Sequence, residues 1–352
     1  MRKRITLVAP INTFSGYGQL AIWIVRQVER LTGAYVSIRC THKSEAFSST
    51  IPRDIKERFV SGPQPEPWEI VLQSVQFRCT PGKRTLYFTM WESTRLPAGC
   101  VGLLNLADAI VVPSHWNASV FSACGVDKPI RVVPLGVDPG IFHFRYNSRG
   151  FSDLAKPPFV FAAAGRSMHS KERKGLDDAI QAFLLAFPDN PNVRLVIKKF
   201  PDDPCEMPDD PRITINNEFL SDSGIADWLD KCDCFVSLAK AEGWGLLQHQ
   251  AMAVGRPVIA CKHSSLCEFY DDRSGYPVRW KMVPVPLNNS IRYRGHWYEP
   301  DVLHAAEQME RAYANRNDSE IIGGEASRQA HKFTVDGFGE KLVEVMSEFG
   351  VL

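Results

Sequence analysis

The amino-acid sequence predicts an α/β protein built from two doubly wound domains, and three observations lead to this prediction. The chain has 352 residues, which corresponds to about two domains of roughly 150 residues each. Strand-like apolar segments alternate with helical patterns in both halves, as in parallel sheets covered by helices on both faces. A polar stretch that ends in two prolines, residues 144–158, interrupts this alternation and is typical of a linker.

The first half of the chain contains six strand-like segments. It opens with an apolar run at residues 5–10, followed by a polar glycine loop at 12–19 and a helical pattern at 20–31 that Gly33 ends. The further strand-like segments are residues 34–40, 69–75, 84–90, 109–114 and 130–137. We therefore expect residues 1–155 to form one Rossmann-like domain with a mainly parallel sheet.

The alternation restarts after the polar stretch. Strands are expected at residues 159–165, 193–200, 213–220, 234–240 and 257–261, and helices at residues 176–187, 224–232 and 246–255. Residues 279–300 show no clear period and are expected to be a loop, after which helices resume at 302–315 and 337–349. We assign residues 156–335 to a second Rossmann-like domain.

Composition places the protein among ordinary globular proteins, with 44% hydrophobic and 23% charged residues. No apolar run approaches the ~20 residues of a membrane span. The N-terminus lacks the apolar core and cleavage site of a signal peptide. We therefore expect a cytoplasmic protein, in a bacterium or in a virus-infected host cell.

The cysteines and acidic pairs do not predict a metal site. Nine cysteines are scattered, and the close pair Cys232 and Cys234 has no second pair at zinc-ligand spacing, so we expect free thiols. The four Asp-Asp pairs lie beside prolines or helix starts and are expected to be caps and solvated loops. They are residues 177–178, 202–203, 209–210 and 271–272.

The net charge of +1 hides an asymmetry between the two halves. Residues 1–155 hold 18 Lys and Arg against 11 Asp and Glu, while the remainder holds 23 against 29. A basic first half favours an anionic partner for that half, and scattered surface cations are the alternative.

A glycine pattern follows the first predicted strand, with Gly16 and Gly18 spaced as in a dinucleotide-binding loop. The acidic residue that such a loop needs for the ribose is missing at the end of the second strand, at residues 35–43. NAD binding is therefore disfavoured. We expect Gly16, Tyr17 and Gly18 to face a ligand, with a plain strand-to-helix turn as the alternative.

Two cations lie beside predicted helix starts in the second half. Arg166 follows Gly165 at the end of a strand, and Lys174 precedes Gly175 at the start of a helix. An arginine can bind a diphosphate with two hydrogen bonds and a lysine can add a point charge. A solvated basic loop at residues 167–174 is the alternative.

The stretch AEGWGLLQHQ, at residues 241–250, lies between a predicted strand and a predicted helix. Its glycines allow backbone N–H groups to face a ligand at the helix N-terminus, where the dipole favours phosphate. Glu242 would lie at the strand end and Gln250 about one turn inside the helix. The candidate binding residues of the turn are Gly243, Trp244, Gly245, Leu246 and Leu247.

This stretch resembles the signature of retaining family-4 glycosyltransferases of GT-B fold, in which seven residues separate two glutamates. Here seven residues separate Glu242 from Gln250, and AMAVGRPVIA follows. Gly165-Arg166 and Lys174-Gly175 are similar to the phosphate-binding arginine and lysine of that family, with a longer gap between them.

The resemblance covers most of the chain, from Ser15 to about Cys261. Residues 111–126 and 130–142 are similar to the end of the family's N-terminal domain. The resemblance implies a GT-B fold, in which residues 1–155 bind the acceptor and residues 156–335 bind the nucleotide sugar. It also implies that residues 336–352 form a C-terminal helix packing back on the N-terminal domain.

The resemblance implies a role for each matched residue. Arg166 and Lys174 would neutralise the diphosphate of a UDP- or GDP-sugar, and Glu242 would bind hydroxyls of the transferred sugar. Backbone N–H groups of residues 244–247 would meet sugar and phosphate, and Gln250 would bind the ribose. No tightly bound cofactor and no metal ion is expected. Phe219 is a candidate partner for the nucleotide base, with a core aromatic as the alternative.

Two positions depart from the family pattern. Where many relatives carry a histidine facing the sugar, residues 86–93 read LYFTMWES, and Glu92 is the candidate sugar ligand or general base. A surface or capping carboxylate is its alternative. At Gln250 an amide replaces a carboxylate, which would weaken donor binding by roughly 1 kcal/mol, or less than tenfold.

The resemblance therefore implies a glycosyltransferase that moves a sugar, expected to be a hexose, to an acceptor hydroxyl with retention. The stretch TMWE at residues 89–92 resembles a stretch found in viral and phage glycosyltransferases. Some of those enzymes glycosylate hydroxymethylated DNA bases. Nucleic acid is thus one acceptor hypothesis, beside a polysaccharide, a lipid-linked sugar or a protein. A nucleotide-sugar epimerase and an inactive sugar-nucleotide-binding protein are the alternatives in other functional classes.

Overall fold

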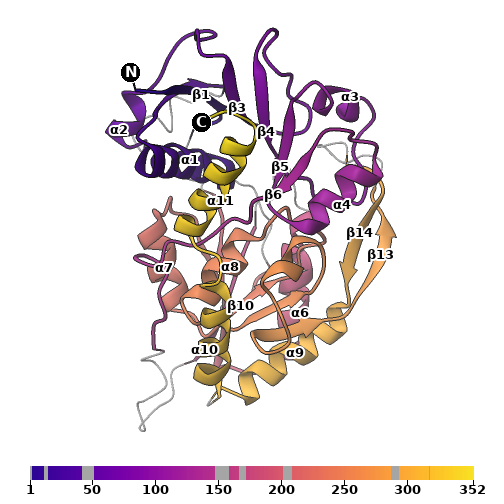
Figure 1. The fold of residues 1–352 in the computed structure, drawn as a ribbon. Helices are drawn as coiled ribbons and strands as arrows, with labels where there is room; N and C mark the ends of the chain where they lie inside the picture. The colour runs from indigo at the N-terminus through magenta and orange to yellow at the C-terminus, as the bar shows by residue number, and fades with distance from the viewer. Residues whose placement is uncertain are drawn as a thin grey trace. The chain divides into compact units, whose positions relative to one another are not determined.

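The computed structural model describes residues 2–11, 15–41, 51–146, 158–165, 172–200, 208–286, 293–316 and 318–352 (Figure 1). The chain divides into two compact units, Met1–Gly136 with Phe333–Leu352, and Val137–Lys332. This division lies ahead of the polar stretch in which the sequence analysis places the boundary. Residues 147–157 of that stretch lie outside the described residues.

The first unit contains a six-stranded parallel sheet in the order β2-β1-β3-β4-β5-β6. Its central strands are buried on both faces, which explains their continuous apolar sequences. The strands are β1 Arg4–Ala9, β2 Tyr35–Cys40, β3 Trp68–Leu72, β4 Arg84–Phe88, β5 Ala109–Val112 and β6 Ile130–Val132.

The helices of the first unit include the last helix of the chain. They are α1 Gly16–Thr32, α2 Arg53–Lys56, α3 Cys100–Leu104, α4 His115–Ala123 and α11 Val335–Glu348. Thr334 caps α11 by accepting the Gly337 N–H at 3.1 Å. Asp336 accepts a hydrogen bond from Gln27 of α1 at 3.1 Å. The C-terminal helix therefore packs on α1 within the first unit.

The second unit contains another six-stranded parallel sheet, in the order β12-β11-β10-β7-β8-β9. Together the two sheets confirm the predicted α/β class with two Rossmann-like domains. The strands are β7 Phe159–Ala164, β8 Val193–Lys198, β9 Ile213–Asn216, β10 Cys234–Ser237, β11 Val258–Cys261 and β12 Gly275–Val278.

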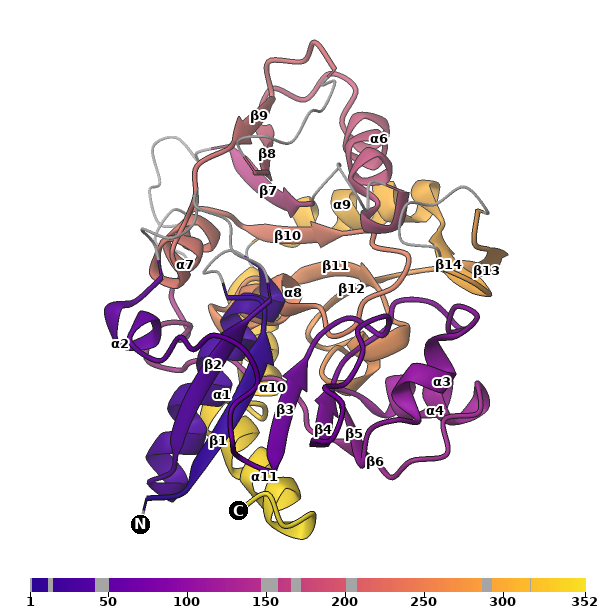
Figure 2. The same ribbon diagram turned by 90° about the horizontal axis from the view of Figure 1, so that it is seen from above.

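The helices of the second unit cover both faces of this sheet (Figure 2). They are α6 Leu176–Ala186, α7 Asp222–Asp230, α8 Leu246–Ala253, the 3₁₀ helix η3 Ser264–Glu268, α9 Val302–Ala314 and α10 Ser319–Ala330. Helix α10 was not predicted from the sequence, because two glycines interrupt its pattern. One of them, Gly323, is required by packing, since a Cβ there would overlap the backbone carbonyl of Gly255.

The expected loop at residues 279–300 is wrong, because its two ends form an antiparallel hairpin. β13, Trp280–Pro284, pairs with β14, His296–Pro300, as a two-stranded sheet of their own (Figure 2). The prolines and polar residues between the strands hide the alternation in the sequence. The pairing is set by tertiary contacts, including the ring of Tyr298, which stacks on His263 at 4.6 Å.

The described cysteines are all free, as expected. Four of them are buried, three are half-buried and Cys267 is exposed. Among the described residues, no helix is both long and apolar enough to cross a membrane.

Candidate active site

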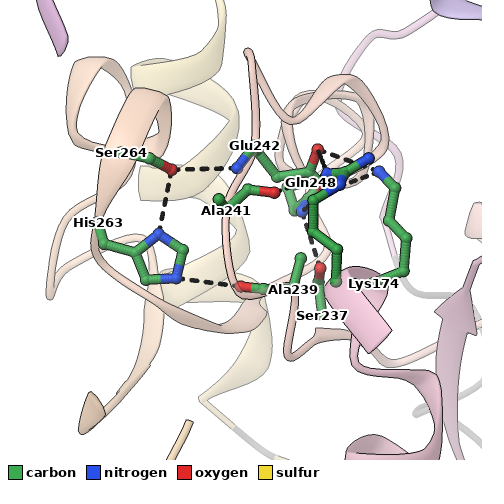
Figure 3. Close-up of polar contacts among 9 residues, drawn as sticks. Lys174, Ser237, Ala239, Ala241, Glu242, Gln248, His263 and Ser264 are labelled. Carbon is green, nitrogen blue, oxygen red and sulfur yellow. Dashed lines mark hydrogen bonds and ion pairs between the residues drawn. The ribbon is translucent and has the colours of Figure 1, made fainter. Parts of the chain in front are cut away.

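Glu242 lies at the centre of a group of donors on the loop between β10 and α8 (Figure 3). The Lys174 ammonium lies 2.7 Å from Glu242 Oε1 and 3.0 Å from Oε2. Arg173 Nη1 donates to Oε2 at 3.3 Å, and Gln248 Nε2 lies 3.5 Å from Oε1. Since the Glu242 side chain is only 8% exposed, this carboxylate exchanges water for protein donors.

The surroundings of Glu242 favour its ionised form. Burial alone would raise the pKa of this carboxyl. The charges of Lys174 and Arg173, with hydrogen bonds from Lys174 and Gln248, outweigh burial and lower the pKa below its usual value. Glu242 is therefore a buried carboxylate that is negatively charged at neutral pH.

A glycine brings Lys174 to this position. Gly175 precedes α6 in the left-handed region, with φ of 61°. A Cβ at Gly175 would overlap the carbonyl oxygen of Leu238, which follows β10. Because only glycine allows this close approach, the segment before α6 runs against the end of β10. The alternative of a solvated loop is wrong for Arg173, which is buried, and for Lys174, which is half-buried.

The backbone of Glu242 is held by a serine and a histidine that the sequence analysis did not single out. Ser264 Oγ accepts the Glu242 N–H at 3.2 Å and lies 3.0 Å from His263 Nδ1. His263 Nε2 lies 3.0 Å from the Ala239 carbonyl oxygen, which can only accept. We therefore assign the proton of His263 to Nε2, and Ser264 donates to Nδ1.

Two properties mark this pair as structurally constrained. Ser264 has a φ of 47°, which is uncommon for a residue other than glycine. Burial lowers the pKa of His263 to about 4, so the ring is neutral at pH 7. No motif in the sequence points to this support, because it depends on contacts between the ends of β10 and β11.

The glycine turn before α8 presents backbone N–H groups. Gly245 precedes the helix with φ of 95°, and a Cβ there would lie 2.8 Å from Leu266 Cδ1. The first intrahelical bond runs from the His249 N–H to the Gly245 carbonyl at 3.0 Å. The N–H groups of Leu246 and Leu247 precede that bond and lie in the first turn, where an anion is favoured.

The side chains of Trp244 and Gln250 are both buried within the protein. Trp244 is buried, and its Nε1 donates to His249 Nδ1 at 3.2 Å. The Trp244 ring also packs on Phe269 at 5.0 Å. Gln250 is on α8 and is 2% exposed. Trp244 thus offers only its backbone to a ligand, whereas Gln250 lies about one helical turn from Leu246, as its spacing predicts.

The candidates of the first unit lie around the start of α1 and the end of β4. Ser15 caps α1 by accepting the Gly18 N–H at 3.1 Å. A Cβ at Gly16 would meet nothing within 4 Å, so packing within this unit does not require a glycine there. Burial and the charge of nearby Glu92 raise the pKa of Tyr17 above its usual value. The structure therefore brings Tyr17 and Glu92 together.

The remaining candidates lie at the ends of β7 and β9. Gly165 follows β7 and donates its N–H to the Lys198 carbonyl at 3.3 Å. Arg166 lies outside the described residues. Phe219 is 43% exposed and packs edge to face with Phe200 at 6.0 Å, so its interpretation as a core aromatic is wrong.

A hollow of about 440 Å³ lies elsewhere in the second unit, lined by Phe144, Gly324, Ser327, Arg328, His331 and Lys332. Its basic side chains already have partners within the protein. His331 contacts the carbonyls of Ser327 and Phe142, at 2.7 and 2.8 Å, and Arg328 pairs with Glu325. The hollow contains none of the candidate residues.

Within the described residues, no three His, Cys, Asp or Glu side chains gather as metal ligands would.

Residues 158–284 match a protein-family model described as "Glycosyl transferases group 1". The match spans β7 to β13 and so includes Lys174, Glu242 and Gln250. Among curated protein sequences, none matches the chain.

Solved structures with the same fold cover nearly the whole chain. HepE of Anabaena, solved in complex with UDP-glucose, has 14% identity and a TM-score of 0.69 over 98% of this chain and 99% of HepE. A sucrose-phosphate synthase from Thermosynechococcus elongatus has 14% identity and a TM-score of 0.68, covering 99% and 100%. An α,α-trehalose 6-phosphate synthase from Burkholderia multivorans has 10% identity and a TM-score of 0.64, covering 100% and 99%. The TM-scores and the coverage show that the chain shares the GT-B fold of these structures, and at identities this low the likeness shows the fold alone.

Proposed function

We propose that the protein is a glycosyltransferase that moves a hexose from a UDP- or GDP-sugar to an acceptor hydroxyl with retention. The observation that carries this proposal is the buried Glu242 carboxylate, held by Arg173 and Lys174 beside the glycine turn of α8. A nucleotide sugar carries hydroxyls, which a carboxylate can bind. It also carries a diphosphate, which a cation and a helix N-terminus can bind. The family match and the UDP-glucose complex of HepE support the same donor class.

Each candidate residue of the second unit has a role in this proposal. Lys174 neutralises the diphosphate together with Arg166, and the N–H groups of Leu246 and Leu247 bind phosphate and sugar. Gln250 binds the ribose. Further donor contacts are proposed for Gly165, Phe219, Gly243, Trp244 through its backbone, and Gly245.

The reaction in this proposal takes place on one face of the sugar. The bond from the sugar to the departing phosphate breaks, the acceptor oxygen bonds to the same carbon, and the phosphate takes the acceptor proton. Lys174 and the α8 N–H groups stabilise the charge that grows on the phosphate, so electrostatic preorganisation supplies the main catalytic effect. The proposal needs no protein nucleophile, metal ion or tightly bound cofactor.

The first unit binds the acceptor in this proposal. The excess of basic residues in the first 155 positions favours an anionic acceptor, and hydroxymethylated DNA is the one that we propose to test first. Gly16, Tyr17 and Gly18 would contact the ligand at the start of α1. Glu92 would bind the sugar or, as the alternative to proton transfer to the phosphate, act as general base.

A thermal-shift panel of UDP- and GDP-sugars identifies the donor, and transfer assays with hydroxymethylated DNA, polysaccharides and lipid-linked sugars identify the acceptor. We expect Lys174→Met to lower turnover by about 10²–10³-fold, the loss typical for a group that stabilises transition-state charge. Lys262→Met is the matched control, since Lys262 is exposed on the same unit.

Three outcomes would redirect the proposal. Conversion of the sugar nucleotide without an acceptor would indicate an epimerase. Donor binding without hydrolysis or transfer to any acceptor would indicate a binding protein. Wild-type turnover in Lys174→Met would refute the diphosphate role of Lys174.

A further inference from the structure

Arg173 and Lys174 both contact Glu242, but only Arg173 is fixed by several other groups. The Arg173 side chain is 7% exposed. Its Nη1 also donates to the Ala241 carbonyl at 2.7 Å, and its guanidinium lies 5.9 Å from the centre of the Tyr293 ring. Arg173 is therefore held in place by the backbone beside Glu242 and by the segment that precedes β14.

The Lys174 ammonium is held by Glu242. Among the residues that the structure describes, Glu242 is the one group that bonds or pairs with this ammonium. The Lys174 side chain is 28% exposed. An ammonium on a flexible stem changes partners more easily than a planar guanidinium held at several points. Lys174 is thus the cation that an arriving anion can draw away from Glu242.

Gln248 provides a further fixed donor. Its Nε2 donates to Ser237 Oγ at 2.8 Å and lies 3.5 Å from Glu242 Oε1. The side chain is buried, so it stays beside the carboxylate whatever Lys174 does. Arg173 and Gln248 therefore contact the two oxygens of Glu242 from separate elements.

We propose that Arg173 is the permanent counter-charge of Glu242, whereas Lys174 is a transferable cation that leaves Glu242 for the diphosphate of an arriving sugar nucleotide. This inference rests on the proposed function. When Lys174 leaves, Arg173 keeps Glu242 ionised and in position, and the oxygens that Lys174 occupied accept hydroxyls of the sugar. Donor binding thereby brings Lys174 to the diphosphate and frees the Glu242 oxygens for the sugar in one step. Arg173 is a positioning residue that acts through Glu242.

The reason for two cations follows from the burial of Glu242. A buried carboxylate that loses its only counter-charge takes up a proton, because the charged form is poorly solvated. A protonated carboxyl has lost part of its acceptor capacity. With Lys174 as the sole cation, binding of the diphosphate would thus disable the group that has to hold the sugar.

A first experiment needs no nucleotide. Arg173→Met, Lys174→Met and the double variant are compared with wild type by thermal unfolding at pH 7.5 and pH 5. Either cation alone compensates Glu242, so each single variant loses little. The double variant melts on the order of 10 °C lower at pH 7.5. The difference in melting temperature between the double variant and wild type is smaller at pH 5, because a Glu242 without a counter-charge has a raised pKa and is protonated there.

One result of this experiment would overturn the proposal. If Lys174→Met alone shows the large, pH-dependent loss expected of the double variant, Arg173 does not compensate Glu242 by itself. Arg279→Met is the matched control, since it removes an arginine that pairs with Asp301 on the surface of the same unit.

A second experiment measures protons. UDP-glucose is titrated calorimetrically at pH 7 in buffers of different ionisation enthalpy. Wild type takes up no proton at Glu242. Arg173→Met takes up about one proton per nucleotide, because Glu242 is protonated when Lys174 leaves. Arg173→Lys restores the wild-type value. A merely structural Arg173 would change affinity without this uptake, and equal uptake in wild type and Arg173→Met contradicts the proposal.

Failure of the proposed function has a different signature. Wild-type protein that binds neither UDP-glucose, GDP-glucose nor UDP refutes that function and, with it, the transfer of Lys174. The unfolding data of the first experiment remain independent of this result and show which cation compensates Glu242.

Discussion

At the scale of single residues, the buried charge on Glu242 needs compensation from the protein. An isolated buried carboxylate would lose its hydration without compensation. Here Lys174, Arg173 and Gln248 all direct donors at it, so the ionised form prevails. Removing one partner of a buried ion pair leaves an uncompensated charge, which strongly destabilises the fold. The donors around Glu242 must therefore stay in place as long as the carboxylate is ionised.

Gln250 allows a direct test of the ribose contact. We expect Gln250→Glu to tighten donor binding by less than about tenfold or to leave it unchanged, because a carboxylate forms stronger bonds to hydroxyls. Calorimetry with the donor found by the panel measures this. A large loss of affinity would mean that the amide is needed as a donor, or that a second carboxylate cannot ionise at this buried position.

Two buried histidines predict how stability depends on pH. Burial lowers the pKa of both His249 and His263 to about 4 in the folded protein. In the unfolded chain a histidine titrates near ~6.5, so between these values the unfolded state binds more protons. Stability is therefore full above pH ~6.5 and falls as the pH drops towards about 4, by on the order of 2 kcal/mol per histidine at pH 5.

Urea unfolding at pH 7 and pH 5 measures this loss, and His263→Gln provides the comparison. Glutamine has no charge to gain, so this variant is expected to lose less stability than wild type on acidification, whatever its stability at pH 7. An equal loss in both proteins would show that His263 is not neutral in the folded state.

At the scale of elements, Glu242 and the residues that contact it lie in or beside the connections that follow parallel strands. Lys174 precedes α6, Glu242 follows β10, and Ser264 follows β11. In a parallel sheet the carboxyl ends of the strands meet at one edge, so residues distant in sequence gather there. The glycines of these loops permit the close approach that the side-chain contacts need.

Gly175 provides the sharpest test of this arrangement. Gly175→Ala combines an unfavourable φ of 61° with overlap between Cβ and the Leu238 carbonyl. We expect a loss of at least about 2 kcal/mol in the free energy of unfolding, together with weaker donor binding, because Lys174 is displaced. Urea unfolding and calorimetry measure the two effects.

Gly324→Ala is the matched control for this variant. Gly324 lies inside α10, and a Cβ there would meet nothing within 4 Å. Alanine is therefore expected to leave stability unchanged or to raise it by up to about 1 kcal/mol. Similar losses in both variants would argue against a special role for Gly175.

At the scale of the whole molecule, the chain forms two units that are not continuous in sequence. The last twenty residues, Phe333–Leu352, belong to the first unit. The apolar face of α11 is buried there, through Phe338, Leu342, Val345 and Met346. The final helix therefore contributes to the stability of a domain whose other strands and helices come from the first 136 residues.

Leu342→Ala tests this assignment. The side chain is fully buried, so we expect a loss of about 2–5 kcal/mol, confined to the first unit. Hydrogen exchange by mass spectrometry should show faster exchange in α1 and β1 and no change in β10 and β11. Glu340→Ala, at an exposed position of the same helix, is the control. Faster exchange throughout both units would contradict the assignment.

Most of the fold could be predicted from the pattern of apolar residues. Apart from β12, the strands of both sheets were predicted from the sequence, as were the long amphipathic helices α1, α6, α9 and α11. The sequence does not predict β12, α10 or the β13–β14 hairpin, because prolines, glycines and polar residues interrupt the hydrophobic pattern of these elements. These elements depend on contacts with distant segments, such as Gly275 of β12, where a Cβ would overlap the Val258 carbonyl.

The sequence by itself determined the α/β class, the two sheets and the motif around Glu242, because short-range periodicity and spacing encode them. Only the tertiary structure decided that Arg173 is a buried partner of Glu242, that Ser264 and His263 hold its backbone, and that Phe219 is exposed. These contacts join residues that are twenty or more positions apart or depend on burial. Such contacts form only when the tertiary fold brings distant segments together, and local sequence patterns do not encode this.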